Sequence, residues 1–327
     1  MINVAVLGLG YMGQNHVRVL SSIANVNVAA ICDKDPIKIA SISKQYKIKP
    51  YKSYLKLINS ETLNAIFICL PTSLHFQAAS IAVKNNIPLF IEKPICSNIN
   101  EASKLVKLIK IHKTPVMVGH IERFNPVVNE IKQRIKYGEL GKIIKIHTQR
   151  FSPPPGRNHD VSAITDLATH DVDIIRYLIE DEPIRIYSEA QKNQHDKEDL
   201  MISILRYRNG IIGVIEVSWL HPNKTRSITV VGENGMYEAN YLTQELFFYK
   251  GKEKKVAKPS DIILNQNWAD VIKIAFESKE PLQIELKEFI NALNNKSKMP
   301  ITEQDGFAAL KMTQKFYESA RKHILLK

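Results

Sequence analysis

The stretch INVAVLGLGYMGQNHVRVL, residues 2–20, decides the fold of the first half of the chain. Its start, INVAVLG, is rich in apolar and β-branched side chains, which predicts a buried strand. GLGYMG then places glycines at Gly8, Gly10 and Gly13, and a helical pattern follows. This spacing between a strand and a helix is typical of a dinucleotide-binding turn. We therefore predict that the chain begins with a nucleotide-binding βα unit.

The three glycines have separate roles in such a turn. Gly8 permits the tight bend, Gly10 lets the backbone approach a pyrophosphate, and Gly13 allows the helix to pack closely on the strand. The phosphates then rest on the helix N-terminus, whose free N–H groups favour anions. Tyr11 and Met12 lie inside the motif and are counted with the glycines as cofactor-binding residues. A glycine turn that serves packing alone is the alternative.

Asp33 bears on the identity of the cofactor. It follows the second expected strand, residues 26–32, and stands about 20 residues past the last glycine, where a carboxylate accepts hydrogen bonds from the adenosine ribose. A carboxylate there repels a 2′-phosphate, so the sequence favours NAD over NADP. Lys34 and Lys38 can reach a phosphate, so NADP remains the less favoured alternative.

The first 120 residues alternate between short strands and helical patterns. Alternation of this kind predicts a doubly wound parallel sheet with helices on both faces, an α/β fold. The nearly continuous apolar character of the strands fits burial on both sides. We expect strands at 2–8, 26–32, 65–71, 88–92 and 115–119, and helices at 12–23, 74–86 and 99–113.

Beyond residue 121 the pattern changes to successive strands, which suggests an antiparallel sheet in an α+β domain. Two amphipathic helical patterns, 282–295 and 305–324, end the chain. We predict a Rossmann domain at 1–120 and a substrate-binding and oligomerisation domain at 121–327. The strands of the second domain are expected at 142–151, 184–192, 200–207, 210–220, 227–233 and 235–242.

Length and composition exclude several classes of protein. A chain of 327 residues is too long for one ordinary core, which fits two domains. No apolar run approaches the roughly 18 residues that span a bilayer, and the first residues look like a strand rather than a signal peptide, so we expect no membrane partner. The three cysteines are widely spaced and form no CxxC, which favours free thiols in a reducing cytoplasm.

The net charge of +12 raises the question of nucleic-acid binding. The lysines are scattered along the whole chain, and no DNA- or RNA-binding signature accompanies them, so no nucleic-acid partner is expected. The one dense run, GKEKKVAK at 251–258, is interpreted as a polar loop or hairpin edge. An anionic small-molecule substrate is compatible with the excess charge.

Two short motifs follow the strands near the expected cofactor site. PTSLH at 71–75 comes after the strand at 65–71, and EKP at 92–94 comes after the strand at 88–92. Ligands of such sheets bind beyond the carboxyl ends of the strands. A lysine on a short turn at that place, Lys93, is therefore a candidate for chemistry. A solvated lysine is the alternative.

A third motif, DLATHDVDIIRYL at 166–178, places a carboxylate and an imidazole four residues apart. If residues 166–179 are a helix, Asp166, His170, Asp173 and Tyr177 share one line and an apolar remainder can bury against a sheet. A solvated helix face is one alternative. A metal site is another, but it needs three or four ligands, and the sequence offers no second histidine pair. We expect no metal.

GLGYMG, Asp33, PTSLH, EKP and DLATH, in this order, resemble the Gfo/Idh/MocA family of NAD(P)-dependent oxidoreductases over essentially the whole chain. The resemblance implies a dehydrogenase that acts on CH–OH groups. It implies a Rossmann domain followed by a domain whose open, mostly antiparallel sheet supplies the substrate site and often the oligomer interface. A homodimer or homotetramer is therefore expected.

The resemblance also implies roles for particular residues. Lys93 is the catalytic lysine, and Asp166 and His170 complete the active site. The Lys93–Pro94 peptide is expected to be cis, since X–Pro is the one bond where that form is inexpensive. The remaining residues expected to line the cofactor are Leu70, Pro71, Thr72, His75 and Glu92.

A narrower resemblance lies in VGHIERFNP at 118–126 and RFSPPPGRNHDV at 150–161. Both resemble the branch of the family that oxidises the 3-hydroxyl of UDP-N-acetylglucosamine. Arg123, Arg150 and Arg157 are candidates for gripping a substrate diphosphate, because a guanidinium binds phosphate oxygens bidentately. Surface salt bridges are the alternative for each arginine. His120 and Asn125 are expected at the edge of the same pocket.

These residues predict a hydride transfer from a substrate alcohol to NAD. His170 suits the general base because its ordinary pKa is near neutral, and Lys93 as an ammonium stabilises the developing alkoxide. A desolvated lysine can also take the proton, so the base stays open between the two. Two rival functions also stay open: a dehydrogenase of a free sugar, cyclitol or aldose, and a non-catalytic NAD-binding sensor.

Overall fold

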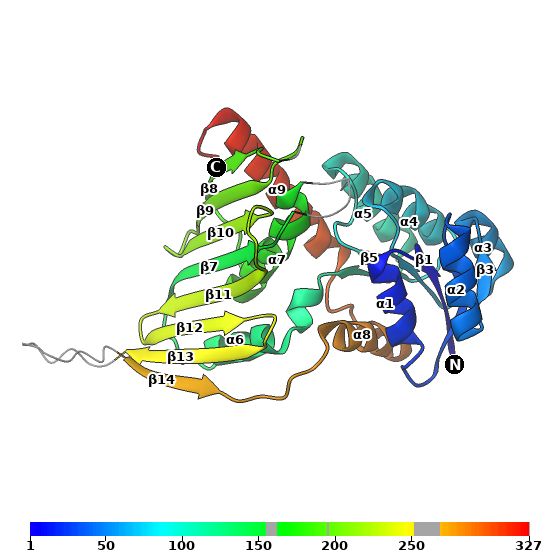
Figure 1. Ribbon diagram of the computed structural model, residues 1–327, viewed down its shortest axis with the longest axis horizontal. Coiled ribbons are helices and arrows are strands. Elements are labelled where there is room, and N and C mark those ends of the chain that lie inside the picture. Colours follow the sequence, from blue (N-terminus) through cyan, green and yellow to red (C-terminus); the bar gives the residue numbers. More distant parts are fainter. Residues whose placement is uncertain (155–161, 195, 252–268, 327) are drawn as a thin grey trace, which may run out of the picture. The chain divides into compact units, whose positions relative to one another are not determined.

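The computed structural model describes residues 1–154, 162–194, 196–251 and 269–326 (Figure 1). By its internal contacts the chain forms two units, one of residues 1–124 and 280–312, the other of residues 125–279 and 313–327. The predicted boundary after residue 120 falls close to the first division. The structure differs in that residues 280–312 return to the first unit.

The first unit contains a six-stranded parallel sheet, which confirms the predicted doubly wound fold. The strand order is β3-β2-β1-β4-β5-β6, so the direction of winding reverses between β1 and β4. Ligands of such sheets bind at this reversal, beyond the carboxyl ends of the strands. The strands are β1 (Ile2–Leu7), β2 (Val26–Cys32), β3 (Lys49–Tyr51), β4 (Ala65–Ile68), β5 (Leu89–Glu92) and β6 (Val116–Gly119).

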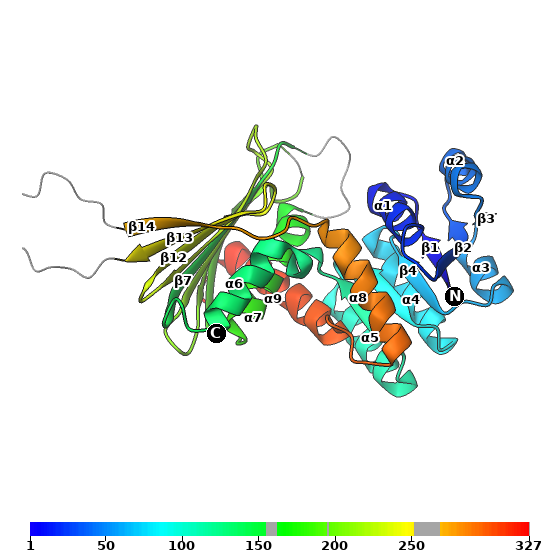
Figure 2. The same cartoon turned by 90° about the horizontal axis from the view of Figure 1, so that it is seen from below.

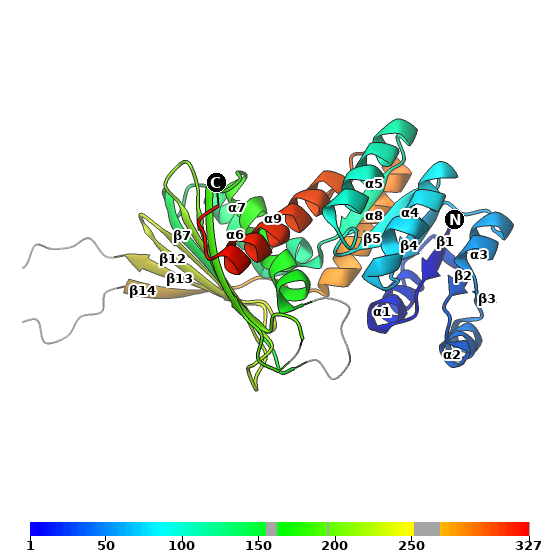
Figure 3. The same ribbon diagram turned by 90° about the horizontal axis from the view of Figure 1, so that it is seen from above.

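Helices cover both faces of this sheet (Figure 3). One face carries α1 (Tyr11–Leu20) packed against α8 (Pro281–Asn295), and the other carries α4 (His75–Lys84) packed against α5 (Ile99–His112). All four were predicted. The strand β3 and two flanking helices, α2 (Pro36–Tyr46) and α3 (Tyr54–Ser60), were not, and the unit also has two short 3₁₀ turns, η1 (Thr72–Leu74) and η2 (Ile121–Phe124).

An aromatic cluster explains why α8 belongs to the first unit. The ring centroid of Phe289 on α8 lies 5.2 Å from that of Phe67 on β4 and 5.7 Å from that of Phe90 on β5. All three side chains are fully buried. Burial of an aromatic side chain stabilises a fold by about 1.5–3 kcal/mol, so this contact holds residues 280–312 to the nucleotide-binding sheet.

The second unit contains an eight-stranded sheet in which only β7 and β10 pair in parallel. This confirms the prediction of a mostly antiparallel sheet. Two strands, β13 and β14, were not predicted. In spatial order the strands are β14 (Ala269–Ile274), β13 (Glu245–Gly251), β12 (Gly235–Asn240), β11 (Thr225–Gly232), β7 (Ile143–Phe151), β10 (Ile212–Ser218), β9 (Leu200–Arg206) and β8 (Arg185–Gln191).

One face of this sheet is covered by helices, whereas no helix of the described ranges covers the other (Figure 2). The covering helices include α6 (Pro126–Lys136), which was not predicted, and α7 (Thr169–Ile179). A long helix, α9 (Glu303–Lys322), contributes its later residues, from Thr313 on, to the second unit. Burial alternates along β9, where Met201, Ser203 and Leu205 are buried and Ile202, Ile204 and Arg206 are exposed, as a sheet with one solvated face requires.

Two further predictions from the sequence concern the lysine-rich run and membrane crossing. Most of the GKEKKVAK run, residues 252–258, lies outside the described residues. None of the described helices combines the length and the hydropathy that a membrane crossing requires.

Candidate functional site

The glycine turn between β1 and α1 is built as its spacing predicts. Gly8 has a φ of +91°, and a Cβ there would lie 2.4 Å from the carbonyl oxygen of Cys69. A Cβ on Gly13 would lie 1.8 Å from the carbonyl oxygen of Gly8. Only glycine therefore fits either position, because L side chains avoid such φ values and such contacts.

Gly10 differs from the other two glycines. It is the N-cap of α1, and a Cβ there would meet nothing within 4 Å. Space is thus open on the side where a pyrophosphate would approach, and no side chain caps the helix N-terminus. The N–H groups of the first turn, which includes Tyr11 and Met12, are the type of donor that binds phosphate.

Asp33 directly follows β2 and joins two segments of the site. Its Oδ2 accepts the amide N–H of Leu9 at 2.5 Å, and its Oδ1 accepts that of Asp35 at 2.9 Å. Each carboxylate oxygen can accept a second hydrogen bond. Asp33 therefore fixes the glycine turn and keeps lone pairs for a ribose.

A cavity of about 470 Å³ lies at this turn. Five of the predicted cofactor-binding residues line it: Gly8, Gly10, Asp33, Leu70 and Pro71. Lys34 and Lys38, named above for NADP, also line it. The lining residues that the sequence did not predict are Cys32, Lys52, Ser53, Tyr54, Cys69 and Leu74. Ser53 carried a usable signal, since it is the N-cap of α3 and serine is a common helix start.

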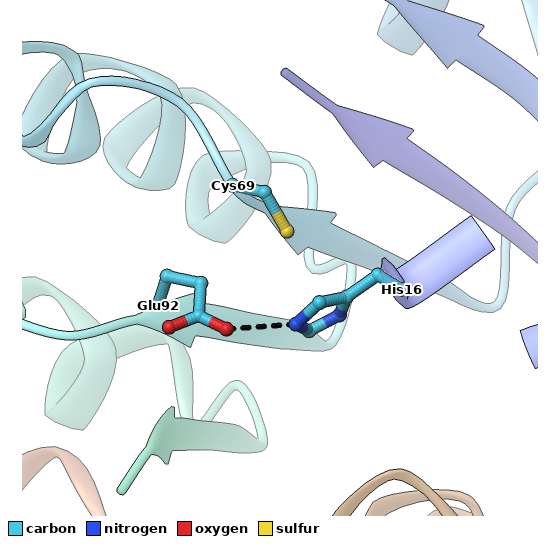
Figure 4. A group of neighbouring side chains, drawn as sticks. All are labelled: His16, Cys69 and Glu92. Carbon is cyan, nitrogen blue, oxygen red and sulfur yellow. Dashed lines mark hydrogen bonds and ion pairs between the residues drawn. The ribbon is translucent and has the colours of Figure 1, made fainter. Parts of the chain in front are cut away.

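Glu92 closes β5 and is not among the residues that line this cavity. Its carboxylate is buried, with Oε1 2.7 Å from Nε2 of His16 on α1 and Oε2 accepting the amide N–H of Lys93 at 3.3 Å (Figure 4). Burial raises the pKa of Glu92, but the hydrogen bond from His16 and the charge of Lys93 outweigh it, so the pKa lies below its usual range. Glu92 is therefore a buried carboxylate.

His75, at the start of α4, is also buried. Its Nδ1 lies 2.9 Å from the carbonyl oxygen of Pro94, and its Nε2 lies 2.8 Å from that of Leu70. Burial lowers the pKa of His75, and the contacts with the two carbonyls oppose that shift without reversing it. Both ring nitrogens thus face backbone of this unit. The Lys93–Pro94 peptide is cis, as expected.

The second unit carries Asp166 and His170, both partly exposed. The single helix expected at 166–179 is in fact a π-helical turn, η3 (Ile164–Ala168), followed by α7. Asp166 lies in the π turn and His170 in the first turn of α7. Single π turns occur frequently at functional sites. Asp173, which was expected on one line with Asp166 and His170, is buried.

The π turn is braced by a tyrosine of α9. The hydroxyl of Tyr317 bonds to the hydroxyls of Ser162 and Thr165, the latter at 3.0 Å. Thr169 donates its hydroxyl to the carbonyl oxygen of Thr165 at 2.6 Å. These contacts fix the backbone on both sides of Asp166.

Arg150, expected to bind a substrate diphosphate, forms a buried ion pair. Its Nε and one terminal nitrogen donate to the two carboxylate oxygens of Asp171, at 3.0 and 3.1 Å, and neither side chain is exposed. Its guanidinium also lies 5.6 Å from the ring centroid of Tyr241. The fork that was expected to grip a substrate diphosphate is directed at a buried carboxylate.

The other candidates for the substrate pocket are distributed as follows. Arg123 pairs with Asp305 at 3.0 Å within the first unit. Asn125 caps α6, accepting the amide N–H of Val127 and donating to the carbonyl of Tyr241, and is buried. His120 is buried as well. Arg157 lies outside the described residues.

Comparison with known proteins adds to this geometry. The Gfo/Idh/MocA oxidoreductase profile, which describes an NAD-binding Rossmann fold, matches residues 2–120. The profile of the Gfo/Idh/MocA C-terminal domain matches residues 128–238. Together the two matches cover the glycine turn, Lys93, Asp166 and His170.

Three curated relatives align with well over half of this chain. An uncharacterized oxidoreductase, YrbE of Bacillus subtilis, is 30% identical over 65% of this chain and 66% of its own length. UDP-N-acetylglucosamine 3-dehydrogenase of Acidithiobacillus ferrooxidans is 23% identical over 88% of this chain and 87% of its own. scyllo-Inositol 2-dehydrogenase of B. subtilis is 27% identical over 68% of each. A solved structure of the A. ferrooxidans enzyme matches with a TM-score of 0.86 at 20% identity, covering 98% of both chains, which shows the fold.

Proposed function

Because this chain belongs to the Gfo/Idh/MocA family of oxidoreductases and has its NAD-binding Rossmann fold, we propose that it oxidises a secondary hydroxyl of a sugar nucleotide with NAD. The substrate we propose is UDP-N-acetylglucosamine, whose 3-hydroxyl becomes the 3-keto sugar. The observation that carries this choice is the relative of that activity, which aligns along nearly nine tenths of both chains.

The cavity at the glycine turn supports NAD as the cofactor. Asp33 lines it with lone pairs available for the ribose hydroxyls, and Gly10 leaves the helix N-terminus open to a pyrophosphate. The chemistry that bound NAD supplies is acceptance of the hydride from the carbon that bears the hydroxyl. Three lysines also line the cavity, Lys34, Lys38 and Lys52. Because a lysine can bind a 2′-phosphate, the preference for NAD over NADP has to be measured.

For the chemistry of the substrate hydroxyl we assign three residues. The ammonium of Lys93 donates a hydrogen bond to the alcohol oxygen and stabilises the developing alkoxide. The imidazole of His170 takes the hydroxyl proton, because its ordinary pKa is near neutral. Asp166, four residues before His170, orients the imidazole or contacts a neighbouring sugar hydroxyl. The bracing of the π turn supports a fixed position for Asp166.

A nucleotide substrate also needs a group that binds its diphosphate. Arg150 forms a buried ion pair with Asp171. Arg123 is paired with Asp305, and the carboxylate lowers the net positive charge that Arg123 offers to a phosphate. Arg157 is therefore our main candidate, with Arg123 second. A guanidinium suits this role because it binds two phosphate oxygens at once.

We further propose a cytoplasmic homo-oligomer. The three cysteines are free thiols, as expected of a reducing compartment. By strand register and burial, Tyr187, Ile202, Ile204 and Ile212 on β8, β9 and β10 share one face and are exposed, opposite the buried residues of these strands. This is the face that no described helix covers (Figure 2). We call these four residues the open-face patch. Exposed apolar patches of this kind favour self-association.

The alternative substrate is a cyclitol or free sugar, favoured by the inositol dehydrogenase relative. The test incubates the protein with NAD and, separately, UDP-N-acetylglucosamine, scyllo-inositol and myo-inositol, and follows NADH absorbance. Reduction with the nucleotide sugar alone supports the proposal. Reduction with an inositol alone replaces it with the alternative, and no reduction with any of the three refutes both.

A variant separates chemistry from binding in the same assay. Lys93→Met should abolish turnover while NAD binding, measured by titration calorimetry, stays nearly intact. Lys110→Met, an exposed lysine on α5, is the matched control and should change neither. Loss of both turnover and NAD binding in Lys93→Met would make the lysine structural.

A further inference from the structure

The turn that carries Lys93 is held on both sides by a buried histidine. The residue before the lysine, Glu92, bonds to His16, and the residue after it, Pro94, has its carbonyl oxygen against His75. His16 is on α1, 76 positions away from Glu92, and His75 begins α4. The two histidines therefore reach the same turn from different elements of the nucleotide-binding unit.

Among the described residues, His16 has a single polar contact, the one with Glu92. Its ring packs edge-on against Phe67 and Phe90, with centroids 5.8 and 5.2 Å away, and its Nδ1 has no hydrogen-bond partner in that part of the chain. An N–H at Nδ1 would be buried in an aromatic cluster at a high cost. The ring hydrogen thus belongs on Nε2, where it is donated to the ionised carboxylate of Glu92.

Glu92 links His16 to the backbone of Lys93. One of its oxygens accepts from His16 and the other accepts the backbone N–H of Lys93. With both bonds made, the carboxylate cannot rotate without breaking one of them. A continuous path of hydrogen bonds therefore runs from the helix of the glycine turn to the backbone of Lys93.

The same cluster has a second interpretation as a metal site. His16, Cys69 and Glu92 bring their ligand atoms within 4.8 Å of one another (Figure 4). However, His16 and Glu92 are bonded to each other at 2.7 Å, which leaves no space for an ion between them. Burial also raises the pKa of the Cys69 thiol well above its ordinary value, so the thiolate form that ligates metals is disfavoured. A hydrogen bond between His16 and Glu92 accounts for this geometry better than a metal site does.

His75 connects the turn to the cofactor cavity. Its Nε2 contacts the carbonyl of Leu70, a residue that lines the cavity, and its Nδ1 contacts the carbonyl of Pro94. A neutral ring donates to one of these carbonyls at a time, and an imidazolium donates to both. In either state the ring holds its two nitrogens against the backbone of the two segments.

We infer that His16 and His75 are positioning residues for Lys93, tying the lysine turn to the glycine-turn helix and to the wall of the nucleotide cavity. This inference rests on the proposed function for the role of Lys93. The polar atoms of Glu92 contact His16 and the backbone N–H of Lys93, and those of His75 contact the carbonyls of Pro94 and Leu70.

We call the contacts of His16 with Glu92 and of His75 with Pro94 and Leu70 the brace. Its His16 arm, the contact with Glu92, can be tested with two variants of similar size. His16→Gln places a donor near the position of Nε2, whereas His16→Leu fills the space without a donor. We expect kcat to fall on the order of 100-fold in the leucine variant, the cost of a misplaced catalytic group, with KM for NAD little changed. The glutamine variant should recover most of that loss. Equal losses in the two variants would overturn the proposal.

The His75 arm has its own matched pair. His75→Asn keeps a donor near Nδ1, facing Pro94, and His75→Gln keeps one near Nε2, facing Leu70. If the bond to the lysine turn matters, the asparagine variant retains the higher kcat. A higher kcat in the glutamine variant, or no difference, would overturn this arm. His112→Leu, which changes a partly exposed histidine on α5, serves as the control that should leave kcat unchanged.

A measurement independent of activity separates this inference from the proposed function. Reductive methylation of all variants, followed by peptide mass spectrometry, compares the labelling rate of Lys93 with that of exposed Lys110 in the same chain. Loss of the brace should change the ratio severalfold in His16→Leu and much less in His16→Gln. An unchanged ratio refutes the brace even in an active enzyme. A changed ratio in a protein that reduces no NAD supports the brace and refutes the proposed function.

If the leucine variant fails to fold, His16→Asn replaces it, because the asparagine donor is too short to reach Glu92.

Discussion

Arg150 and Asp171 form a two-pronged ion pair inside the second unit, with side chains 1% and 0% exposed. The pair joins β7 to the first turn of α7, one residue after His170. Two parallel hydrogen bonds fix both the distance and the plane of the guanidinium. The helix that carries His170 is therefore attached to the sheet by a contact that allows little rotation.

Removing one member of this pair should be costly. Asp171→Ala takes away the carboxylate to which Arg150 donates twice, and breaking a buried pair in this way costs about 3–5 kcal/mol. Urea unfolding followed by circular dichroism measures the change in the free energy of unfolding. Glu318→Ala, which removes an exposed pair with Lys322, is the control and should cost less than about 1 kcal/mol. Similar values for the two variants would contradict the structural role given to Arg150.

The two ends of the glycine turn should respond differently to alanine. Gly13→Ala forces the backbone of Gly8 to move, since the new Cβ would lie 1.8 Å from its carbonyl oxygen, and overpacking of this kind costs about 1–3 kcal/mol or more. The new Cβ of Gly10→Ala would have no atom of the protein within 4 Å, so the melting temperature of this variant should be unchanged. Its NAD binding should weaken, because the Cβ would occupy the side that a pyrophosphate approaches. Thermal melts and NAD titrations give both quantities. Normal NAD binding by Gly10→Ala would place the pyrophosphate elsewhere.

Asp33 should decide between the two nicotinamide cofactors. The wild-type protein is expected to use NAD with a higher kcat/KM than NADP. Asp33→Ser removes the charge that repels a 2′-phosphate, while Lys34 and Lys38 stay in the cavity, so the ratio should shift towards NADP. Asp181→Ser, an exposed aspartate of the second unit, should leave the ratio unchanged. A wild-type preference for NADP would refute this assignment.

His75 should make folding sensitive to acid. Burial lowers its pKa below the ordinary value of 6.5, so below pH 6.5 the unfolded chain binds a proton that the folded chain does not. This contribution to stability is fully present above pH 6.5 and is lost as the pH falls through the lower folded value. Urea unfolding across this range should show a steeper loss for the wild-type protein than for His75→Asn. Parallel curves would mean that the imidazole titrates equally in both states.

The open-face patch should hold subunits together. Ile204→Lys places a charge in the patch, and buried unpaired charges are strongly unfavourable at interfaces. Light scattering after gel filtration should show a smaller species than for the wild-type protein. Ile111→Lys, which changes a more exposed isoleucine of the first unit, should leave the mass unchanged. A wild-type monomer, or no effect of Ile204→Lys, would remove this face from consideration.

Local patterns explain what could be predicted from the sequence. The glycine turn and Asp33 are recognisable because strand, turn and helix follow one another directly, so their spacing is fixed by backbone geometry. The apolar face of α7 was predictable for the same reason, and its residues Val172, Ile174 and Ile175 are buried. The elements β3 and α3 escaped because runs of three and seven residues show little periodicity.

Contacts between distant positions could not be predicted in this way. His16 and Glu92 are 76 positions apart, and Arg150 and Asp171 are 21 apart on a strand and a helix. No spacing rule relates such residues, because their pairing depends on how elements pack. A buried arginine and a phosphate-binding arginine look alike in sequence, which is why Arg150 was assigned to the substrate. The π turn at Asp166 was missed because it differs from an α-helix only in its hydrogen bonds.

The return of residues 280–312 to the first unit has a consequence for how the chain is made. Phe289 reaches the Rossmann sheet only after the intervening residues have been synthesised. Domains usually fold from the N-terminus as they leave the ribosome, but here the nucleotide-binding core is incomplete until residues 280–312 have emerged. Until then Phe67 and Phe90 lack their contact with Phe289, and a premature stop before residue 280 truncates both units rather than one.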